Sequence, residues 1–124
     1  MQIAATANNA IAKLAGASVK PTTNSIIVQE SLIAGFQYHQ GNQIWPVLAA
    51  GDALQLEREN DNSNDRNAIA IFFRNFKLGY VPRRENTTLA RFFDEKRPIT
   101  AAIIELTASD SKQQAVNFRV EMEI

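Results

Sequence analysis

The chain has 124 residues, with 13 Lys or Arg and 13 Asp or Glu, so its formal net charge is zero. This length suits one domain with an ordinary hydrophobic core. The absence of Cys excludes disulfides, thiolate nucleophiles and cysteine zinc sites, and the single His, His39, removes multi-histidine metal sites. The neutral total also removes the simplest argument for a nucleic-acid partner, a domain that is basic throughout.

Residues 1–24 differ in composition from the rest, because they are rich in Ala, Asn and Thr and contain no aromatic residue. They predict an N-terminal arm, either a flexible extension or a leader remnant, ahead of a domain that spans residues 25–124. No stretch approaches the roughly 20 consecutive apolar residues that a membrane-spanning helix needs. We therefore expect no membrane association and take the cytoplasm as the default location.

From Ser25 onward, short β-branched and apolar runs separated by turn signals predict strands. The run at 68–73 is apolar at every position, which indicates a strand covered on both faces. Alternating apolar and polar residues at 53–59 and 118–124 indicate strands with one wet face. The expected strands are 26–28, 32–36, 53–59, 68–73, 76–81, 99–106 and 118–124.

One α-helix is expected at about 86–96. Polar residues at 85–88 supply N-terminal capping groups, Leu89, Phe92 and Phe93 form one apolar stripe, and Pro98 ends the helix. Six or seven short strands with one helix predict a mainly β fold, a small barrel or curled sheet of about six strands with the helix at one end.

The acidic residues give little support to catalysis or metal binding. Asp61, Ser63 and Asp65 have the spacing of a calcium loop, but Arg66 stands where that loop needs Gly. Glu57 and Glu59 recur at strand spacing and could share a face, as paired catalytic carboxylates do. A solvated strand face explains them equally well, so we expect a non-catalytic protein without metal or cofactor.

The charge distribution is more informative than the total. From Arg66 to Arg84 there are five cations and no acid, which gives this window a charge of +5, and aromatic residues are interleaved with the cations. Cations beside aromatic rings on a β surface suit single-stranded nucleic acid, because they match phosphates and bases. The alternative is that the Phe residues belong to the core and the cations only solubilise.

A second aromatic feature is the pair Tyr38 and His39. Exposed together, these two flat side chains would form a stacking platform for bases. The alternative is that one of them packs inward and the other is an ordinary surface residue.

Taken together, three separated segments resemble the HIRAN domain, which occurs at the N-terminus of certain DNA helicases and as small stand-alone bacterial proteins. Their order and spacing agree with that family over about Ile26 to Ile124. The segments are 32–41 (LIAGFQYHQG), 58–69 (RENDNSNDRNAI) and 78–83 (LGYVPR).

The resemblance implies an OB-like or SH3-like β-barrel with a helix, and capture of the 3′ end of single-stranded DNA. Tyr38 would stack on a terminal base, with His39 at a second aromatic position. Asn62 and Asp65 would hold the terminal nucleotide, with Asp65 accepting a hydrogen bond from the 3′ hydroxyl. The phosphate-facing positions of the family correspond to Tyr80 and Arg83, and Arg66 or Arg84 would add a further contact.

This sequence departs from the family pattern at several of these positions. The two prolines of the family's loop are replaced by Asn60 and Ser63, which predicts a more flexible loop. Asn64 and Gln37 stand where the helicase domain has a stacking Tyr and an Arg, so one stacking face and one phosphate contact are missing.

Our leading hypothesis is a non-catalytic module for single-stranded DNA, in particular its 3′-hydroxyl ends, in DNA repair or at replication forks. Its partners would be DNA ends and a DNA-processing protein, and its oligomeric state is left open. The alternative is a protein-interaction or oligomerisation module that keeps the barrel without the DNA pocket, which the neutral charge and the N-terminal arm favour. A hydrolase that uses Glu57, Glu59 or Asp65 has the least support.

Overall fold

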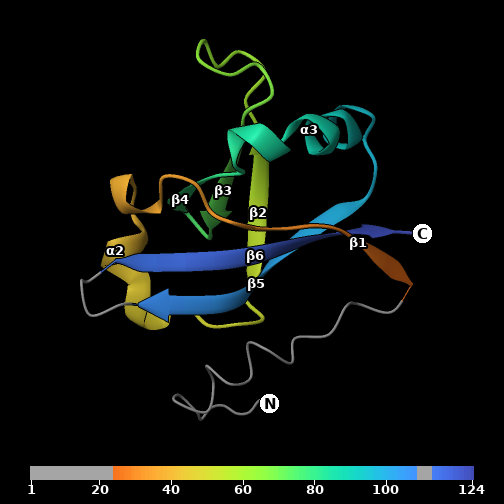
Figure 1. Cartoon of the computed structure of the whole chain (residues 1–124). Helices are drawn as coiled ribbons and strands as arrows, with labels where there is room; N and C mark the ends of the chain where they lie inside the picture. Colours follow the sequence, from red (N-terminus) through yellow and green to blue (C-terminus); the bar gives the residue numbers. More distant parts are fainter. Residues whose placement is uncertain (1–23, 109–112) are drawn as a thin grey trace.

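A computed structural model of the chain describes residues 24–108 and 113–124; the N-terminal arm expected at 1–24 thus lies almost wholly outside the described residues. Six antiparallel strands form one sheet with the order β1-β6-β5-β2-β3-β4 (Figure 1). The strands are β1 (Ser25–Leu32), β2 (Ala53–Arg58), β3 (Ile69–Phe73), β4 (Phe76–Tyr80), β5 (Ile99–Ala108) and β6 (Gln114–Glu123). The helical elements are η1 (Phe36–Tyr38), α2 (Gly41–Ile44), η2 (Trp45–Val47), η3 (Arg83–Glu85) and α3 (Thr87–Asp94).

The mainly β, barrel-like architecture is confirmed, although the sheet is not closed. β1 and β4 are its two edge strands. One isolated bridge joins Ala34, just beyond β1, to Tyr80 in β4. The Ala34 N–H donates to the Tyr80 carbonyl at 2.8 Å, and the Tyr80 N–H donates to the Ala34 carbonyl at 3.0 Å. The chain after β1 therefore brings the two edges of the sheet together.

This bridge depends on the glycine that precedes Tyr80. Gly79 has φ +148°, and a Cβ at this position would lie 2.3 Å from the Ala34 carbonyl oxygen. Any larger residue would push the two segments apart, because that contact is far below a van der Waals distance. Gly79 thus permits the close approach of backbones that forms one wall of the candidate site.

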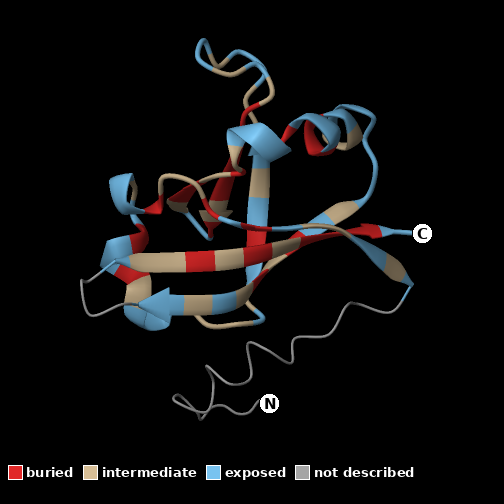
Figure 2. Cartoon of the chain, in the orientation of Figure 1, coloured by how far each residue is buried: buried red, intermediate tan, exposed pale blue. Residues whose placement is uncertain are grey.

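The core lies between the curled faces of the sheet, with β3 and β6 at its centre (Figure 2). Ile69, Ala70 and Ile71 are fully buried, which confirms the prediction that this strand is covered on both faces. α3 adds Leu89 and Ala90 to the core. β2 pairs with β5 through only two residue pairs, and in Figure 1 β2 runs up the view while β5 and β6 run across it.

The regular alternation predicted for the last strand breaks down near its end. Met122 is buried, but so is its neighbour Glu121, whereas Ile124 is 77% exposed. Here β1 lies along β6 with a register shift between Ile27 and Gln29, and Ser25 Oγ donates a hydrogen bond to Glu121 Oε1. Coverage by the edge strand therefore buries a residue that the alternation assigns to solvent.

The prediction for residues 32–48 was wrong in detail. A second strand was expected at 32–36, but β1 is continuous to Leu32 and η1 follows it. The expected turn at Gly41 is instead the start of the short helix α2, a second helix in addition to α3. A Cβ on Gly41 would lie 2.1 Å from the Phe36 ring, so the glycine makes room for that ring to be buried. Trp45 packs edge-to-face on Phe36, with ring centroids 5.8 Å apart.

Candidate nucleic-acid interface

An open pocket of about 210 Å³ is lined in part by the loop that joins β2 to β3. Three segments meet there: the chain just after β1, the β2–β3 loop, and the end of β4 leading into η3. We call it the end pocket; its lining residues are Ala34, Asn62, Asp65, Ala68, Tyr80, Val81 and Arg83. Four of the eight residues predicted for DNA binding, Asn62, Asp65, Tyr80 and Arg83, are therefore brought together.

Asn62 organises the β2–β3 loop from within. Its Oδ1 accepts hydrogen bonds from the backbone N–H groups of Asn64 at 2.8 Å and Asp65 at 3.2 Å. Its Nδ2 donates to Glu59 Oε1 at 3.0 Å. The loop is further closed where the Ala68 N–H donates to the Asp65 carbonyl at 3.0 Å. These side-chain bonds give the loop a source of order that the missing prolines would otherwise supply.

Both carboxylate oxygens of Asp65 are held by the protein. Oδ1 accepts from the Asn67 N–H at 3.0 Å, and Oδ2 accepts from Asn86 Nδ2 at 2.8 Å. A carboxylate offers about four acceptor sites, so each oxygen keeps room for a further donor. The half-buried Asp65 therefore presents an oriented acceptor at the wall of the pocket.

Asn86, which supports Asp65, is a site residue that the sequence analysis missed. The residue stands at the N-cap of α3, yet its side chain makes no capping hydrogen bond, contrary to the capping expected at 85–88. The side chain is 1% exposed and turns toward Asp65 instead. Burial explains the bond to Asp65, because a buried amide N–H needs an acceptor and a carboxylate is a strong one.

A second polar cluster lies behind Tyr80. Its hydroxyl donates to Glu59 Oε1 at 3.0 Å and accepts from Lys77 Nζ at 2.7 Å. Lys77 Nζ also lies 3.5 Å from Glu59 Oε2 and 4.4 Å from the centre of the Tyr80 ring. The cluster ties β4 to the end of β2 and orients the Tyr80 ring at the pocket.

The same contacts shift the pKa values of the two charged members. Burial acts to raise the pKa of Glu59, but hydrogen bonds from Asn62 and Tyr80 together with the charge of Lys77 outweigh it, so this pKa is lowered. Burial acts to lower the pKa of Lys77, but the Tyr80 hydroxyl and the Glu59 charge outweigh it and raise this pKa. Both groups are therefore held in their charged forms.

The predicted stacking pair Tyr38 and His39 is split by the fold. Tyr38 lies in η1 and is 80% exposed. The His39 ring packs edge-on against Tyr80, with centroids 5.8 Å apart, and its Nδ1 lies 2.8 Å from the Gly35 carbonyl. Because a carbonyl only accepts, Nδ1 carries the proton. Tyr38 thus has an exposed ring, whereas the His39 ring packs against the Tyr80 ring.

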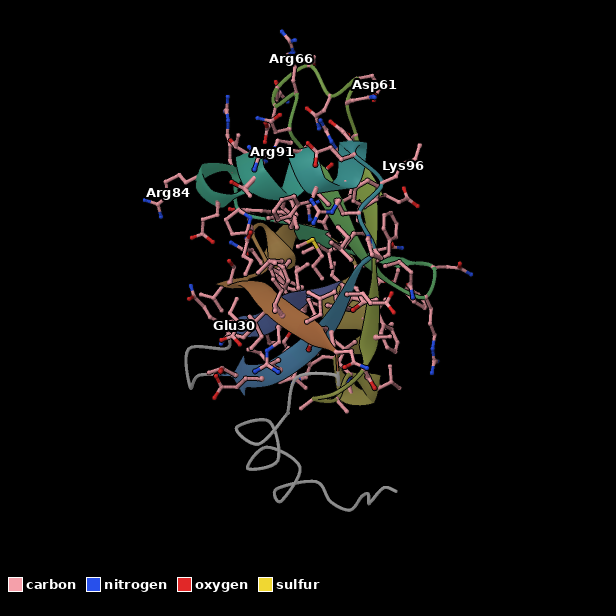
Figure 3. All side chains as sticks on the ribbon, turned by 90° about the vertical axis from the view of Figure 1, so that its right-hand side faces the viewer. Glu30, Asp61, Arg66, Arg84, Arg91 and Lys96 are labelled. Carbon is pink, nitrogen blue, oxygen red and sulfur yellow. The ribbon has the colours of Figure 1, made fainter. Side chains whose placement is uncertain are left out.

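The arginines of the predicted site remain unpaired within the described part of the chain. The guanidinium groups of Arg66, Arg83 and Arg84 form no ion pair there. Arg83 lines the end pocket, whereas Arg66 and Arg84 do not. Figure 3 shows Arg66 at the tip of the β2–β3 loop and Arg84 projecting outward at the left of the view, below that loop. Of the interleaved phenylalanines, Phe73 is buried and Phe72 and Phe76 are half-buried, as the core interpretation expects.

The described residues of the site offer hydrogen-bonding and charged groups for binding. Among residues 24–108 and 113–124, no group of three or more His, Asp or Glu side chains gathers as a metal site would require. Glu59 is engaged with Lys77 and Tyr80, and Glu57 is exposed on β2. Within the same ranges, no helix has the length and apolar character that crossing a membrane would require.

Fold and pocket together define a small, barrel-like β domain with an open pocket beside the β2–β3 loop. The HIRAN domain family matches residues 26–124, and the chain belongs to this family. The HIRAN domain is a family of DNA-binding domains.

Two solved structures are similar to this one. A crystal structure of a protein from Lactobacillus plantarum is 24% identical with a TM-score of 0.60, and the match covers 78% of this chain and 96% of that one. The crystal structure of the HIRAN domain of human HLTF is 19% identical with a TM-score of 0.59, and the match covers 81% of both chains. These likenesses support the fold. Among curated proteins, none matches the sequence.

Proposed function

We propose that this domain binds single-stranded DNA at free 3′-hydroxyl ends, without catalysis, and serves DNA repair or replication-fork processing. The observation that carries the proposal is the Asp65 carboxylate, oriented by Asn67 and Asn86 at the wall of an open pocket that also contains Arg83. A terminal 3′ hydroxyl is a donor that an oriented carboxylate binds well. A 3′ phosphate in the same place would be repelled by that charge.

The unpaired arginines supply the complementary contact to the phosphates of the strand. Arg83 lies in the pocket beside Asp65, so one end of a strand could meet both groups at once. The chain is neutral overall, which leaves few cations for non-specific attraction. Affinity should therefore depend on the end pocket rather than on a broad basic surface.

Tyr38 completes the proposed surface as the stacking element. Its exposed ring can lie against a base at little cost, because η1 already fixes its backbone and the Tyr38 N–H donates to the Gly35 carbonyl at 2.9 Å. Stacking of one base on an aromatic ring contributes about 1–3 kcal/mol and tolerates any base. We therefore assign Tyr38 to affinity and Asp65 to end selection.

The test is a titration of short single strands that differ only at the 3′ terminus, as hydroxyl or phosphate, followed by fluorescence anisotropy in low salt. We expect the hydroxyl strand to bind at least tenfold more tightly, the size of one hydrogen bond to a charged group. A strand with a blocked 5′ end is the control and should bind like the free strand. Equal affinity for both 3′ ends, or no binding below millimolar concentration, would refute the proposal.

A second candidate function, association with another protein chain, is favoured by one observation. β1 is an edge strand along which no other described strand pairs on the outer side, and its Ile26 and Ile27 are 45% and 43% exposed. Exposed apolar edges are sites where another strand can add. Analytical ultracentrifugation of the full chain and of Ile26→Lys tests this: a dimer that the substitution dissolves would support association, and a strict monomer would exclude self-association.

A further inference from the structure

Arg58, the last residue of β2, joins the β2–β3 loop to α3, which lie at the same end of the molecule (Figure 1). Its Nε and Nη2 donate to the two carboxylate oxygens of Asp94 at 3.0 and 3.1 Å. Its Nη1 donates to the backbone carbonyls of Arg66 at 2.7 Å and Ala68 at 3.3 Å. The Arg58 side chain is only 11% exposed. One guanidinium group therefore connects a helix side chain to the backbone of the loop.

The two carbonyls that Arg58 holds belong to the turn that carries Asp65. Arg66 follows Asp65 directly, and the Ala68 N–H donates to the Asp65 carbonyl at 3.0 Å. The Ala68 carbonyl also accepts from the Glu59 N–H at 2.9 Å. A shift of this turn would move the Asp65 carboxylate with it. The contacts of Arg58 therefore restrict where that carboxylate can lie.

α3 thus supports Asp65 from both of its ends. Before its first turn, Asn86 Nδ2 donates to Asp65 Oδ2 at 2.8 Å. At its other end, Asp94 is its last residue and reaches the same turn through Arg58. A hydrogen bond weakens steeply when its angle departs from linearity, so a carboxylate that selects a terminal hydroxyl needs a fixed direction as well as a fixed place.

The Arg58–Asp94 ion pair is better suited to orienting the guanidinium than to stabilising the whole domain. Asp94 is 52% exposed, and an ion pair at such a position adds little to the free energy of unfolding. Its two parallel hydrogen bonds, however, fix the plane of the guanidinium and so direct Nη1 at the loop carbonyls. A Lys in this place would keep the charge but lack the planar fork that makes these contacts together.

We propose that Arg58, oriented by Asp94, is a positioning residue for end selection: it holds the turn at 65–68 so that the Asp65 carboxylate faces a 3′ hydroxyl. This inference rests on the proposed function, because it assumes that Asp65 receives that hydroxyl. It assigns part of the selectivity to two residues that do not line the end pocket.

The binding experiment compares single strands with a 3′ hydroxyl or a 3′ phosphate, by fluorescence anisotropy, in two conservative variants. Arg58→Lys should lower the ratio of the two affinities about three- to tenfold, the effect of losing one or two hydrogen bonds. Asp94→Asn should lower it about two- to fivefold, since Arg58 keeps its loop contacts but loses the charged partner that orients it. Glu95→Gln is the matched control, because Glu95 follows Asp94 and pairs only with exposed arginines at 3.8–4.0 Å among the described residues; it should leave the ratio unchanged.

Native-state hydrogen exchange, measured without DNA, separates positioning from general stability. The Asp65 and Ala68 amides, which donate to Asn62 Oδ1 and to the Asp65 carbonyl, report on the loop. Amides of β6, which is paired on both sides, report on global unfolding. In Arg58→Lys we expect the loop amides to exchange several-fold faster while those of β6 change less. Acceleration of both sets by the same factor would overturn the proposal, because Arg58 would then be only structural.

The wild-type protein separates this proposal from the proposed function. If it prefers the hydroxyl end and both variants keep that preference in full, Arg58 is not a positioning residue and the end pocket stands. If it shows no preference for the hydroxyl end, the proposed function fails and the role of Arg58 in end selection fails with it. A preference that falls in both variants but not in Glu95→Gln, together with faster exchange confined to the loop, is the result that we expect.

Discussion

The acids and the arginines around the end pocket are held in opposite ways. Asp65 and Glu59 have both carboxylate oxygens engaged by hydrogen bonds, from Asn67 and Asn86 in one case and from Asn62, Tyr80 and Lys77 in the other. Arg66, Arg83 and Arg84 form no ion pair with any residue in the described ranges.

From this difference we expect the hydrogen-bonded carboxylates to set selectivity and the unpaired arginines to set affinity. A carboxylate fixed by two donors loses little freedom on binding and can distinguish a hydroxyl from a phosphate by geometry and charge. A free guanidinium loses side-chain entropy when it meets a phosphate, and its attraction is screened by salt. We therefore expect the hydrogen-bonded Asp65 to act in recognition and the unpaired arginines in and around the pocket to act in attraction, and each kind can be tested separately.

The largest effect is expected from removing the Asp65 carboxylate. Asp65→Ala should lower the preference for a 3′ hydroxyl over a 3′ phosphate by about 10- to 100-fold, because a hydrogen bond to a charged group contributes roughly 1.5–3 kcal/mol. The ratio of the two dissociation constants by fluorescence anisotropy measures this. Asp61→Ala, at an exposed position of the same loop, should leave the ratio unchanged. An unchanged ratio in Asp65→Ala would show that Asp65 does not select the 3′ end.

The second-largest effect is expected from Asn86, which donates a hydrogen bond to Asp65. Asn86→Ala should lower the free energy of unfolding by about 1–3 kcal/mol, because it deletes a buried amide and leaves Asp65 Oδ2 without its donor. It should also weaken the 3′-hydroxyl preference while sparing the affinity for a phosphorylated end. Urea melts and the same pair of strands measure both. Thr88→Ala, exposed on the same helix, should change neither; a loss of stability with unaltered preference would show that Asn86 is only structural.

Much of the fold was predictable because periodic burial leaves a direct trace in sequence. The run at 68–73 and the alternation at 53–59 placed β3 and β2 within a residue of their observed bounds. The stretch from 32 to 48 was not predictable, because its order comes from tertiary contacts. Burial of the Phe36 ring against Gly41 and Trp45 selects short helices where local propensity favours strand and turn.

The site was predictable to the extent that it is built from residues of the three family-like segments. Asn62, Asp65 and Arg83 come from two of them and line one pocket. Asn86 escaped prediction because an Asn before a helix is a sufficient local explanation, whereas its partner Asp65 is 21 positions away in the chain. The role of Glu59 was missed for the same reason, since its contacts to Tyr80 and Lys77 cross between strands.

A smaller effect is expected from removing Arg83, the unpaired arginine that lines the end pocket. Arg83→Ala should weaken binding of hydroxyl and phosphate ends by the same several-fold factor, since a phosphate contact carries no information about the terminus. The slope of log affinity against log salt should fall by about 0.7, the value for one phosphate contact on a single strand. Arg91→Ala is the matched control, because Arg91 is exposed on α3 and lies 4.0 Å from Glu95. A change in the hydroxyl preference without a change in slope would show that Arg83 contributes to selection of the 3′ end rather than to phosphate binding.

The smallest expected effect is the pH dependence of the polar cluster behind Tyr80. The pKa of Glu59 is lowered by folding, so the stability that it contributes is present above its usual value of 4.5 and is lost as pH falls through the lowered pKa. The pKa of Lys77 is raised, so its contribution is present below 10.5 and is lost as pH rises through the raised pKa. Because both side chains are partly exposed, we expect Glu59→Gln to cost less than about 1 kcal/mol at pH 7. Urea melts from pH 7 down to pH 3 should show this difference shrink as Glu59 is protonated, and a difference that stays constant would mean that the cluster holds Tyr80 by its hydrogen bonds rather than by its charge.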